Sequence, residues 1–434
     1  MRTLEDAGHA TWAVGGAVRD AWRGRPSEDW DFATAATPRQ VRRLFKRTVP
    51  IGIDHGTVGV LARDGTMYEV TTFRKDVETD GRHAVVEFAE SIDDDLARRD
   101  FTINAIAWHP VRDEWYDPFD GESDLRAGVL RTVGTPADRF REDYLHILRA
   151  LRFAGRFSLE VDPATWSAMR ELVGHLPALS PERIREELLK VLAADPNPAG
   201  ALELYRRCGA LRVLYPELDA LGPARWTDLL GTLGRLPLQR AHLRLAALLR
   251  PLAPDDVAAV LMRLRLSNAV VDETARLATG RPLPAPDAPD GDFRRWLSAH
   301  GAMRLTPLAR LELARARGRA DVGAHAGKGS GQAASEEGDA VAEPDAVAAP
   351  ETVVDAWNRA RAVRRSGAPL TVSDLELDGR GLIGLGLRPG PGFGEILDGL
   401  LDWVLDDPSR NERALLEARA LEVVALGEQE DTGV

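Results

Sequence analysis

Short β-branched runs separated by turns fill the first part of the chain, a pattern typical of a mixed α and β domain. Residues 11–14 are expected to form a strand that leads through Gly15-Gly16 into a short helix. Two further runs flank Asp64-Gly65, a hairpin signal because both residues tolerate positive φ. The N-terminal part is therefore predicted to be an α+β domain with a mixed sheet.

From Thr135 onward the apolar residues recur at helical spacing. Thr135 can cap a helix, and Pro136 suits the first helical position. Later stretches are rich in Leu, Ala and Arg, punctuated by Pro and Gly. Almost everything after Thr135 is expected to be helical, including two amphipathic helices over residues 394–421.

One segment interrupts this helical pattern. Residues 320–350 contain no aromatic side chain and almost no large apolar one. A segment of this composition can bury too little apolar surface to offset the conformational entropy that it would lose on ordering. A disordered linker is therefore predicted. We interpret it as a spacer rather than a regulatory loop.

The composition narrows the class of protein. A chain of 434 residues is long enough for two to four domains. It has no apolar run of membrane-spanning length and no signal-peptide pattern, so a cytoplasmic protein is expected. Its single cysteine excludes internal disulfides and Cys-based metal sites. A net charge of −12 argues against a protein that coats nucleic acid through an overall positive charge. A local basic cleft on an acidic protein is still compatible with this net charge.

The chemically informative cluster is VGGAVRD at residues 14–20, followed by Asp29-Trp30-Asp31. Two glycines between a strand and a helix let backbone amides approach a phosphate closely. On a strand, residues two apart point the same way, so Asp29 and Asp31 are expected to share one face. Such a pair suits Mg²⁺-assisted phosphoryl transfer.

These motifs resemble those of the class II tRNA nucleotidyltransferases, the CCA-adding enzymes and bacterial poly(A) polymerases of the polymerase β superfamily. Matching segments follow in order over residues 10–220: GIDHGTVGVL, YEVTTFR, DDLARRDFTINAIAW, YDPFDG and RFREDYLHILRALRF. The resemblance implies a mixed-sheet nucleotidyltransferase head followed by an all-α neck, body and tail. The expected ranges are 1–130 for the head, 131–185 for the neck, 186–319 for the body, 320–350 for the linker and 351–434 for the tail.

By resemblance, Asp29 and Asp31 hold two Mg²⁺ ions, with CTP and ATP as substrates. Glu69 is either a third acidic group near the metals or a residue that orients an arginine. The nucleotide contacts that the resemblance implies in the head are Gly15, Gly16, Arg19, Arg99 and Asn104.

The helix that begins near Pro136 carries the family's base-recognition motif, E-D-x-x-R. An Asp acceptor beside an Arg donor pairs with the edge of cytosine or adenine and rejects GTP and UTP. Here Glu142 and Asp143 are present, but His146 occupies the arginine position. Either His146 takes that role or Arg149, one turn further along, does; Arg149 and Arg152 also match nucleotide-contacting positions.

Between Phe73 and Val86 the sequence occupies the place of the flexible loop with which such enzymes switch from CTP to ATP. This loop, which includes Arg82, favours an enzyme able to add the terminal A. The segment PIGIDHGTVGVL resembles the CCA-adding branch more than the poly(A) branch. His55 within it is interpreted as a structural hydrogen-bonder.

The sequence thus predicts template-independent addition of CCA to the 3′ end of tRNA. The helical parts are expected to bind the acceptor arm of the tRNA, and no obligate protein partner is predicted. The candidate tRNA-binding helices are two Arg-bearing segments, residues 309–319 and 357–365. The alternatives are an A-adding, a CC-adding or a poly(A)-adding enzyme and, outside this class, a non-catalytic RNA-binding module.

Overall fold

The computed structural model describes residues 1–27, 29–52, 56–79, 84–89, 91–194, 198–238, 240–326, 348–390 and 392–431. These residues belong to two compact units. The first unit comprises Met1–Leu221 and Met262–Arg265, and the second comprises Gly222–Leu261 and Leu266–Val434.

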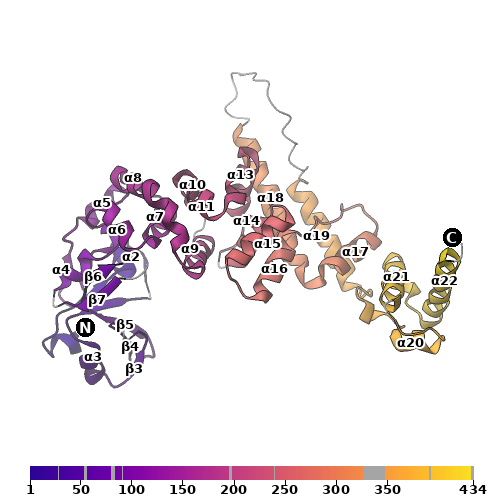
Figure 1. Cartoon of the computed structure of the whole chain (residues 1–434), viewed down its shortest axis with the longest axis horizontal. Helices are drawn as coiled ribbons and strands as arrows, with labels where there is room; N and C mark the ends of the chain where they lie inside the picture. The colour runs from indigo at the N-terminus through magenta and orange to yellow at the C-terminus, as the bar shows by residue number, and fades with distance from the viewer. Residues whose placement is uncertain are drawn as a thin grey trace. The chain divides into compact units, whose positions relative to one another are not determined.

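The first unit opens with a seven-stranded mixed sheet of order β3-β4-β5-β2-β1-β8-β9. Strands β3, β4 and β5 of this sheet are labelled in Figure 1. Neighbouring strands are antiparallel except β2 and β5, which run parallel with Asp31 opposite Glu69. The hairpin predicted around Asp64-Gly65 is present as β4 and β5. The strands are β1 (Thr11–Val14), β2 (Asp31–Thr34), β3 (Thr48–Pro50), β4 (Thr57–Leu61), β5 (Met67–Thr72), β8 (Ala107–His109) and β9 (Glu114–Tyr116).

Alternation along β2 and β5 divides the sheet into two packed faces. Phe32 and Val70 point to the face that the N-terminal helices α1 (Arg2–Glu5) and α3 (Pro38–Leu44) cover. Ala33 belongs to the core on the other face, which helix α4 (Ile92–Ala97) covers through Leu96. Asp31 and Glu69 have the register of Ala33, so the two carboxylates share the second face.

The expectation that Asp29 lies on a strand with Asp31 is wrong, because β2 begins at Asp31. Strand β1 ends at Val14, and Gly15 turns the chain away with φ +81°, so β2 has no partner on that side before Asp31. Helix α2 (Gly16–Trp22) follows the turn.

The flexible loop expected after Phe73 is largely a hairpin of β6 (Arg74–Thr79) and β7 (Ala84–Phe88). β-Branched residues occur in both strands and favour the extended backbone that this pairing requires. Arg82 lies outside the described residues, as does His55.

The single helix expected from Pro136 is two helices, α6 (Pro136–Glu142) and α7 (Leu145–Phe157). Asp143 interrupts them in an extended conformation, with φ −156° and ψ 108°. Its Oδ1 accepts the Leu145 N–H at 3.0 Å, which satisfies one free amide at the start of α7. The remaining helices of the first unit are α5 (Gly121–Ala127), α8 (Pro163–Leu172), α9 (Pro181–Ala194), α10 (Ala199–Cys208), α11 (Ala210–Leu214) and α12 (Pro216–Asp219).

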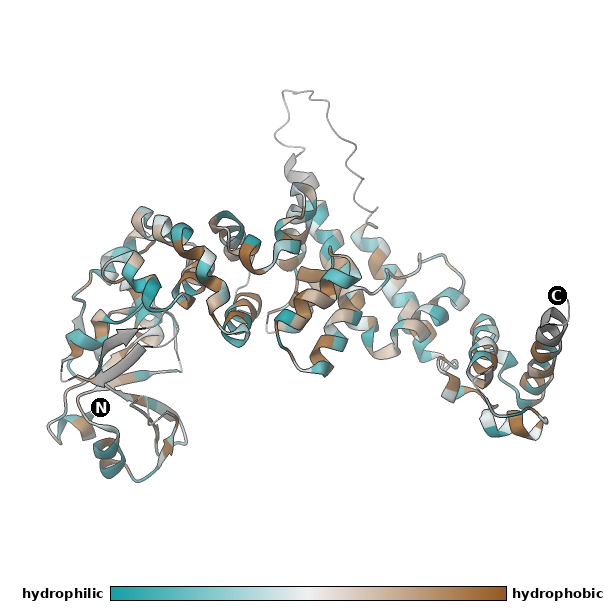
Figure 2. Cartoon of the chain, viewed as in Figure 1, coloured by the Kyte–Doolittle hydropathy of each residue, from teal (hydrophilic) through white to brown (hydrophobic). Residues whose placement is uncertain are grey.

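The second unit is helical in its described residues, and its helices carry apolar and polar residues along the same ribbon (Figure 2). Helix α18 runs to Ala326, so the first part of the predicted linker is helical; residues 327–347 lie outside the described chain. The helices are α13 (Pro223–Leu233), α14 (Ala241–Leu249), α15 (Pro254–Arg263), α16 (Asn268–Ala278), α17 (Asp290–His300), α18 (Leu305–Ala326), α19 (Pro350–Arg365), α20 (Gly379–Gly384), α21 (Gly392–Asp406) and α22 (Arg413–Asp431).

Candidate active site

The glycine turn after β1 brings three predicted site residues together. Gly15 has φ +81° and ψ −146°, a conformation that essentially only glycine adopts. A Cβ atom at Gly15 would lie 3.4 Å from Asp31 Oδ2 and 3.5 Å from Arg99 Nη1. The missing side chain therefore leaves open the space between the Asp31 carboxylate and the Arg99 guanidinium.

Asp31 lies in a concentration of negative charge. Burial raises the pKa of Asp31 to about 6, the charges of Asp29 and Glu69 contribute to this rise, and Arg99 opposes them. Carboxylate oxygens are the ligands that Mg²⁺ prefers. In the described part of the chain, no group of three or more His, Cys, Asp or Glu residues is arranged to hold a metal ion. Asp29 and Asp31 supply carboxylates of the kind that Mg²⁺ prefers, and their role as metal ligands stays a prediction.

Arg99 is anchored from two sides. Its Nη2 donates to Asp95 Oδ2 at 3.0 Å, and its Nη1 donates to the carbonyl oxygen of Asn104 at 3.4 Å. Asp95 is buried in α4, whereas the Arg99 side chain is about one-fifth exposed. These contacts hold one edge of the guanidinium beside Asp31 while the group stays accessible.

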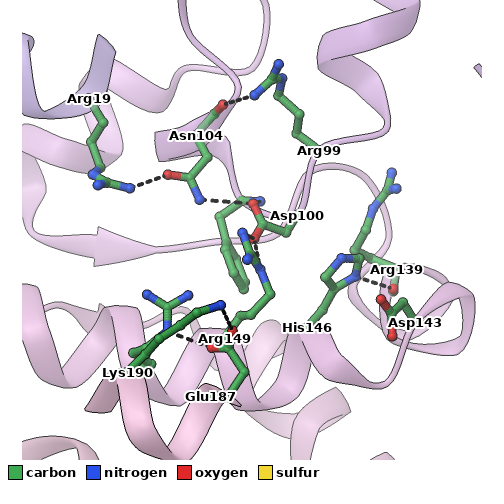
Figure 3. A network of polar contacts seen from close by, with 12 residues as sticks. Arg19, Arg99, Asp100, Asn104, Arg139, Asp143, His146, Arg149, Glu187 and Lys190 are labelled. Carbon is green, nitrogen blue, oxygen red and sulfur yellow. Dashed lines mark hydrogen bonds and ion pairs between the residues drawn. The ribbon is translucent and has the colours of Figure 1, made fainter. Parts of the chain in front are cut away.

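Asn104 and Asp100 connect the segment after α4 to helix α7 (Figure 3). Asn104 lies in the short segment η2 (Thr102–Asn104), and its Nδ2 donates to Asp100 Oδ1 at 2.9 Å. Asp100 Oδ2 in turn accepts from Arg149 Nε and Nη2 at 2.7 and 2.6 Å. Burial alone would raise the pKa of Asp100, but the charges of Arg149 and His146 and these hydrogen bonds hold it well below its usual range.

Arg19 does not project freely toward a ligand. Its side chain is 5% exposed and donates to Asp20 Oδ1 at 3.0 Å and to Asn104 Oδ1 at 2.6 Å. The guanidinium also lies 4.5 Å from the ring centroid of Phe157. Burial lowers the pKa of Arg19, with Asp20 opposing that shift. A role for Arg19 as a phosphate contact stays a prediction.

The residues predicted to recognise the base lie where α6 meets α7. Asp143 Oδ2 accepts from Arg183 Nη2 of α9 at 2.5 Å, and both side chains are about one-quarter exposed. His146 is half-buried, and its Nδ1 lies 3.1 Å from the carbonyl oxygen of Arg139 (Figure 3). Glu142 accepts a hydrogen bond from Arg139 Nη1 at 2.6 Å, and this contact stabilises the end of α6 whose carbonyl group lies beside His146.

Arg149 and Arg152 are both engaged within the protein. Arg149 is held by Asp100, and the charge of Asp100 raises its pKa against the opposing effect of burial. Arg152 Nε donates to Glu187 Oε2 at 2.6 Å, and the side chains of this pair are 9% and 1% exposed. Lys190 donates to the other Glu187 oxygen at 2.9 Å. Nucleotide contacts by Arg149 and Arg152 stay predictions.

Sequence reasoning missed Asp100, Arg183 and Glu187 as parts of this network. Asp100 carried a readable signal, because it lies between two arginines and the apolar run FTINAIAW. An acidic residue at the edge of a buried segment requires a charged or hydrogen-bonding partner. Arg183 and Glu187 lie far along the chain in α9, and nothing local indicates their partners.

A mixed-sheet head with a carboxylate at a glycine turn, continued by helices, is the architecture expected of a nucleotidyltransferase. Residues 11–131 match the family described as the poly A polymerase head domain, and residues 158–221 match a probable RNA and SrmB-binding site of polymerase A. With these matches and the relatives described next, the chain belongs to the family of CCA-adding enzymes, the tRNA nucleotidyltransferases. The resemblance and fold class expected from the sequence are confirmed.

The relatives cover different shares of the chain. The CCA-adding enzyme of Geobacillus kaustophilus is 39% identical over 293 residues, which span 66% of this chain and 70% of that protein. That of Ligilactobacillus salivarius is 38% identical over 229 residues, spanning 51% of this chain and 56% of the relative. The Bacillus stearothermophilus CCA-adding enzyme, solved in complex with CTP, superimposes with a TM-score of 0.72 at 30% identity and covers 99% of this chain and 97% of that one.

Within the described residues, no helix has the length and apolar character needed to cross a membrane.

Proposed function

We propose that this protein adds C, C and A to the 3′ end of tRNA from CTP and ATP without a nucleic-acid template, releasing pyrophosphate. Family membership supports the reaction class, and a relative solved with CTP supports the substrate. The observation that carries the proposal is the environment of Asp31. Its carboxylate interacts with the charges of Asp29, Glu69 and Arg99, and the Gly15 turn lies beside it.

In this proposal Asp29 and Asp31 hold Mg²⁺. When bound, Mg²⁺ favours the deprotonated 3′ hydroxyl and offsets the charge of the leaving pyrophosphate. Arg99, anchored by Asp95, presents a fixed positive charge to the ribose and phosphates. Gly15 leaves room for the triphosphate beside Asp31, because a Cβ there would occupy the space in contact with the Asp31 carboxylate and the Arg99 guanidinium. Glu69 adds to the negative field that favours the cation.

Base selection is assigned to the start of α7, where Asp143 supplies a hydrogen-bond acceptor. The network from Arg19 through Asn104 and Asp100 to Arg149 links this helix to the head. Such a link fixes the distance between the base-reading groups and the reacting phosphate, which template-independent selection requires.

Contact with the tRNA backbone is assigned to α18 and α19. A cavity of about 490 Å³ is lined by Arg235, Arg240, Arg310, Arg317 and Trp357. Among the described residues, the side chains of Arg240, Arg310 and Arg317 have no hydrogen-bond or ion-pair partner. The indole Nε1 of Trp357 is buried and also lacks a partner in that part of the chain. Three uncompensated guanidinium groups beside an unused N–H donor favour a phosphate.

The head, neck, body and tail divisions at residues 130, 185 and 320–350 remain part of this proposal, as does a cytoplasmic location, where CTP, ATP and tRNA are all supplied.

The test uses tRNAs that end before the first C, after the first C and after the second C, each incubated with one nucleotide at a time. We expect CTP to extend the first two and ATP to extend the third. Failure of CTP on every substrate would indicate an A-adding enzyme, and failure of ATP on the third would indicate a CC-adding one. Repeated ATP addition would indicate a poly(A) polymerase, and tRNA binding without any incorporation would indicate a non-catalytic RNA-binding module.

A further inference from the structure

A cavity of about 850 Å³ lies on the face of the seven-stranded sheet opposite Asp31. Phe32 on β2 and Val70 on β5 line it, whereas Asp31 and Glu69 on the same two strands point to the other face. Helix α1 and the end of α3 bound the cavity through Leu4, Leu44 and neighbouring residues. A cavity of this size is within the range of small-molecule sites, and it is separate from the candidate active site.

Positively charged side chains gather at one end of this cavity. Lys46 and Arg47 follow α3, and Arg63 follows β4. The Leu61 N–H at the end of β4 donates to the carbonyl oxygen of Arg47 at 3.0 Å, which brings these two segments together. All three basic side chains are exposed, and within the described part of the chain none of them has a hydrogen-bond or ion-pair partner. Their hydrogen-bond donors are therefore available to a ligand.

Negative charge is missing from the same surface. The described residues that line the cavity include no Asp or Glu. In the whole chain acidic residues outnumber basic ones by 68 to 56, so the lining reverses the overall charge of the protein. Uncompensated positive charges in a hollow raise the local concentration of anions. The ligand is therefore expected to carry several negative charges.

Aromatic rings form another part of the lining. The ring centroids of Trp30 and Trp108 lie 5.5 Å apart, and those of Phe32 and Tyr68 lie 5.9 Å apart. All four side chains are half-buried, so part of each ring stays accessible. The indole N–H of each tryptophan donates to a protein oxygen, at 2.9 and 3.2 Å. The tryptophans thus offer ring surface and not hydrogen bonds, which suits stacking of a planar ligand.

The sheet order relates the charged and aromatic parts. Strands β4 and β2 are two strand spacings apart, or about 10 Å, with β5 between them. Tyr68 on β5 therefore lies between the cations near β4 and Phe32 on β2. Among the described residues the Tyr68 hydroxyl has no hydrogen-bond partner. A planar base joined through a ribose to a chain of phosphates combines the ring, the hydroxyl groups and the charge that this surface can bind.

We propose that this cavity binds a free nucleoside triphosphate, separately from the nucleotide that reacts beside Asp31. The phosphates contact Lys46, Arg47 and Arg63, and the base stacks on the rings of β2, β5 and β8. Stacking accepts any base, so the site does not discriminate strongly among nucleotides. The three cations form one cluster and not a basic groove along a backbone, which favours a single nucleotide over a strand of RNA.

The test measures ATP binding to the full chain by calorimetry in EDTA, because a cavity whose described lining has no carboxylate does not require Mg²⁺ to hold the ligand. We expect the triple variant Lys46→Gln, Arg47→Gln and Arg63→Gln to lose one ATP site per chain, or to weaken it at least roughly tenfold. The matched control removes the same charge from exposed arginines of α3 outside the cavity: Arg39→Gln, Arg42→Gln and Arg43→Gln. Equal ATP binding by the two triple variants would overturn the inference.

The stacking part has its own test. Tyr68→Leu keeps apolar volume but removes the ring, and we expect it to weaken ATP binding at this site roughly fivefold or more while binding of inorganic tripolyphosphate is unchanged. Unchanged ATP affinity in Tyr68→Leu would overturn the inference in favour of a simple polyanion site. Binding of a single-stranded oligoadenylate without binding of ATP would overturn it in favour of an RNA strand.

Photolabelling of the wild-type protein with an azido-substituted ATP keeps the inference testable if a variant does not fold. We expect labelled peptides to include Phe45 or Trp108, which line this cavity and lie outside the candidate active site. Labelling confined to the glycine turn and to α6 and α7 would contradict the inference. Neither measurement requires nucleotide incorporation, so a failure of the proposed function would not be mistaken for a failure of this site.

Discussion

Asp100 Oδ2 accepts hydrogen bonds from Nε and Nη2 of Arg149 at 2.7 and 2.6 Å, which joins the segment after α4 to helix α7. Asp100 is buried and accepts two more hydrogen bonds on Oδ1, from Asn104 and from the Phe101 N–H. Every acceptor direction of a buried carboxylate is thereby used, which is the condition under which such a charge is stable.

Replacement of Asp100 by Asn should destabilise the protein by about 3 kcal/mol at neutral pH, because it leaves the Arg149 charge without its partner. The pKa of Asp100 is depressed in the folded protein, so its ionised form stabilises the fold at pH values above the ordinary range. That contribution is lost as pH falls through the depressed value. Urea unfolding should therefore give a constant difference between wild type and Asp100→Asn above about pH 5 that shrinks below about pH 4. A difference that grows in acid would contradict this role.

Gly15→Ala should reduce incorporation of both CTP and ATP. The substitution places a Cβ 3.4 Å from the Asp31 carboxylate and forces alanine into a positive-φ conformation, at a cost of about 1 to 3 kcal/mol. Gly8→Ala is the matched control, because Gly8 also has positive φ, +85°, but a Cβ added there would meet no heavy atom within 4 Å. Thermal unfolding should change in both variants, and kcat only in Gly15→Ala. Equal activity in the two would mean that the space beside Asp31 is not used.

Arg19→Met separates a packing role from a phosphate-binding role. Because the guanidinium is buried against Asn104 and Phe157, we expect a loss of stability of about 2 kcal/mol. We also expect kcat to fall more than KM changes, because Asn104 would lose its support while direct binding of the triphosphate would be unaffected. A large rise in KM for CTP and ATP at unchanged stability would show instead that Arg19 binds phosphate.

Arg310→Gln with Arg317→Gln should weaken tRNA binding and reduce the dependence of log Kd on log salt concentration by roughly one for each phosphate that an arginine no longer neutralises. Arg276→Gln is the control, since Arg276 is exposed on α16 of the same unit but is paired with Asp272 at 3.0 Å. Filter binding over a range of salt concentrations measures the slope. Equal slopes for the double variant and the control would remove this cavity from the tRNA contact surface.

Local patterns in the sequence predicted much of the fold. The strand over residues 11–14 and the hairpin around Asp64-Gly65 follow from alternation and turn residues, which act over a few positions. The break at Asp143 did not follow, because it depends on one carboxylate turning back to the Leu145 amide within an otherwise helical pattern. The start of β2 at Asp31 depends on where its partner β1 ends, which is a property of the sheet and not of either strand.

The candidate site, like the fold, was predicted from the sequence only in part. Asp31 and Gly15 were predicted from a short ordered motif, and their proximity in the structure agrees with that hypothesis. The environments of Arg19 and Arg152 were not predictable, because 56 of the residues are Lys or Arg and local sequence does not separate a buried arginine from a ligand-binding one. Their partners Asn104 and Glu187 lie 85 and 35 positions away, beyond the reach of periodicity.

Single-turnover incorporation of CTP into a tRNA lacking CCA, with Asp31→Asn compared with Asp6→Asn, tests the role of the carboxylates most directly. Asp6 is an exposed carboxylate at the end of α1, so its replacement should leave the rate unchanged. Asp31→Asn should reduce the rate by at least roughly a thousandfold while tRNA binds with unchanged affinity, because charge stabilisation at the reacting phosphate is lost and the RNA-binding surface is kept. Incorporation by Asp31→Asn at the rate of Asp6→Asn would contradict the account.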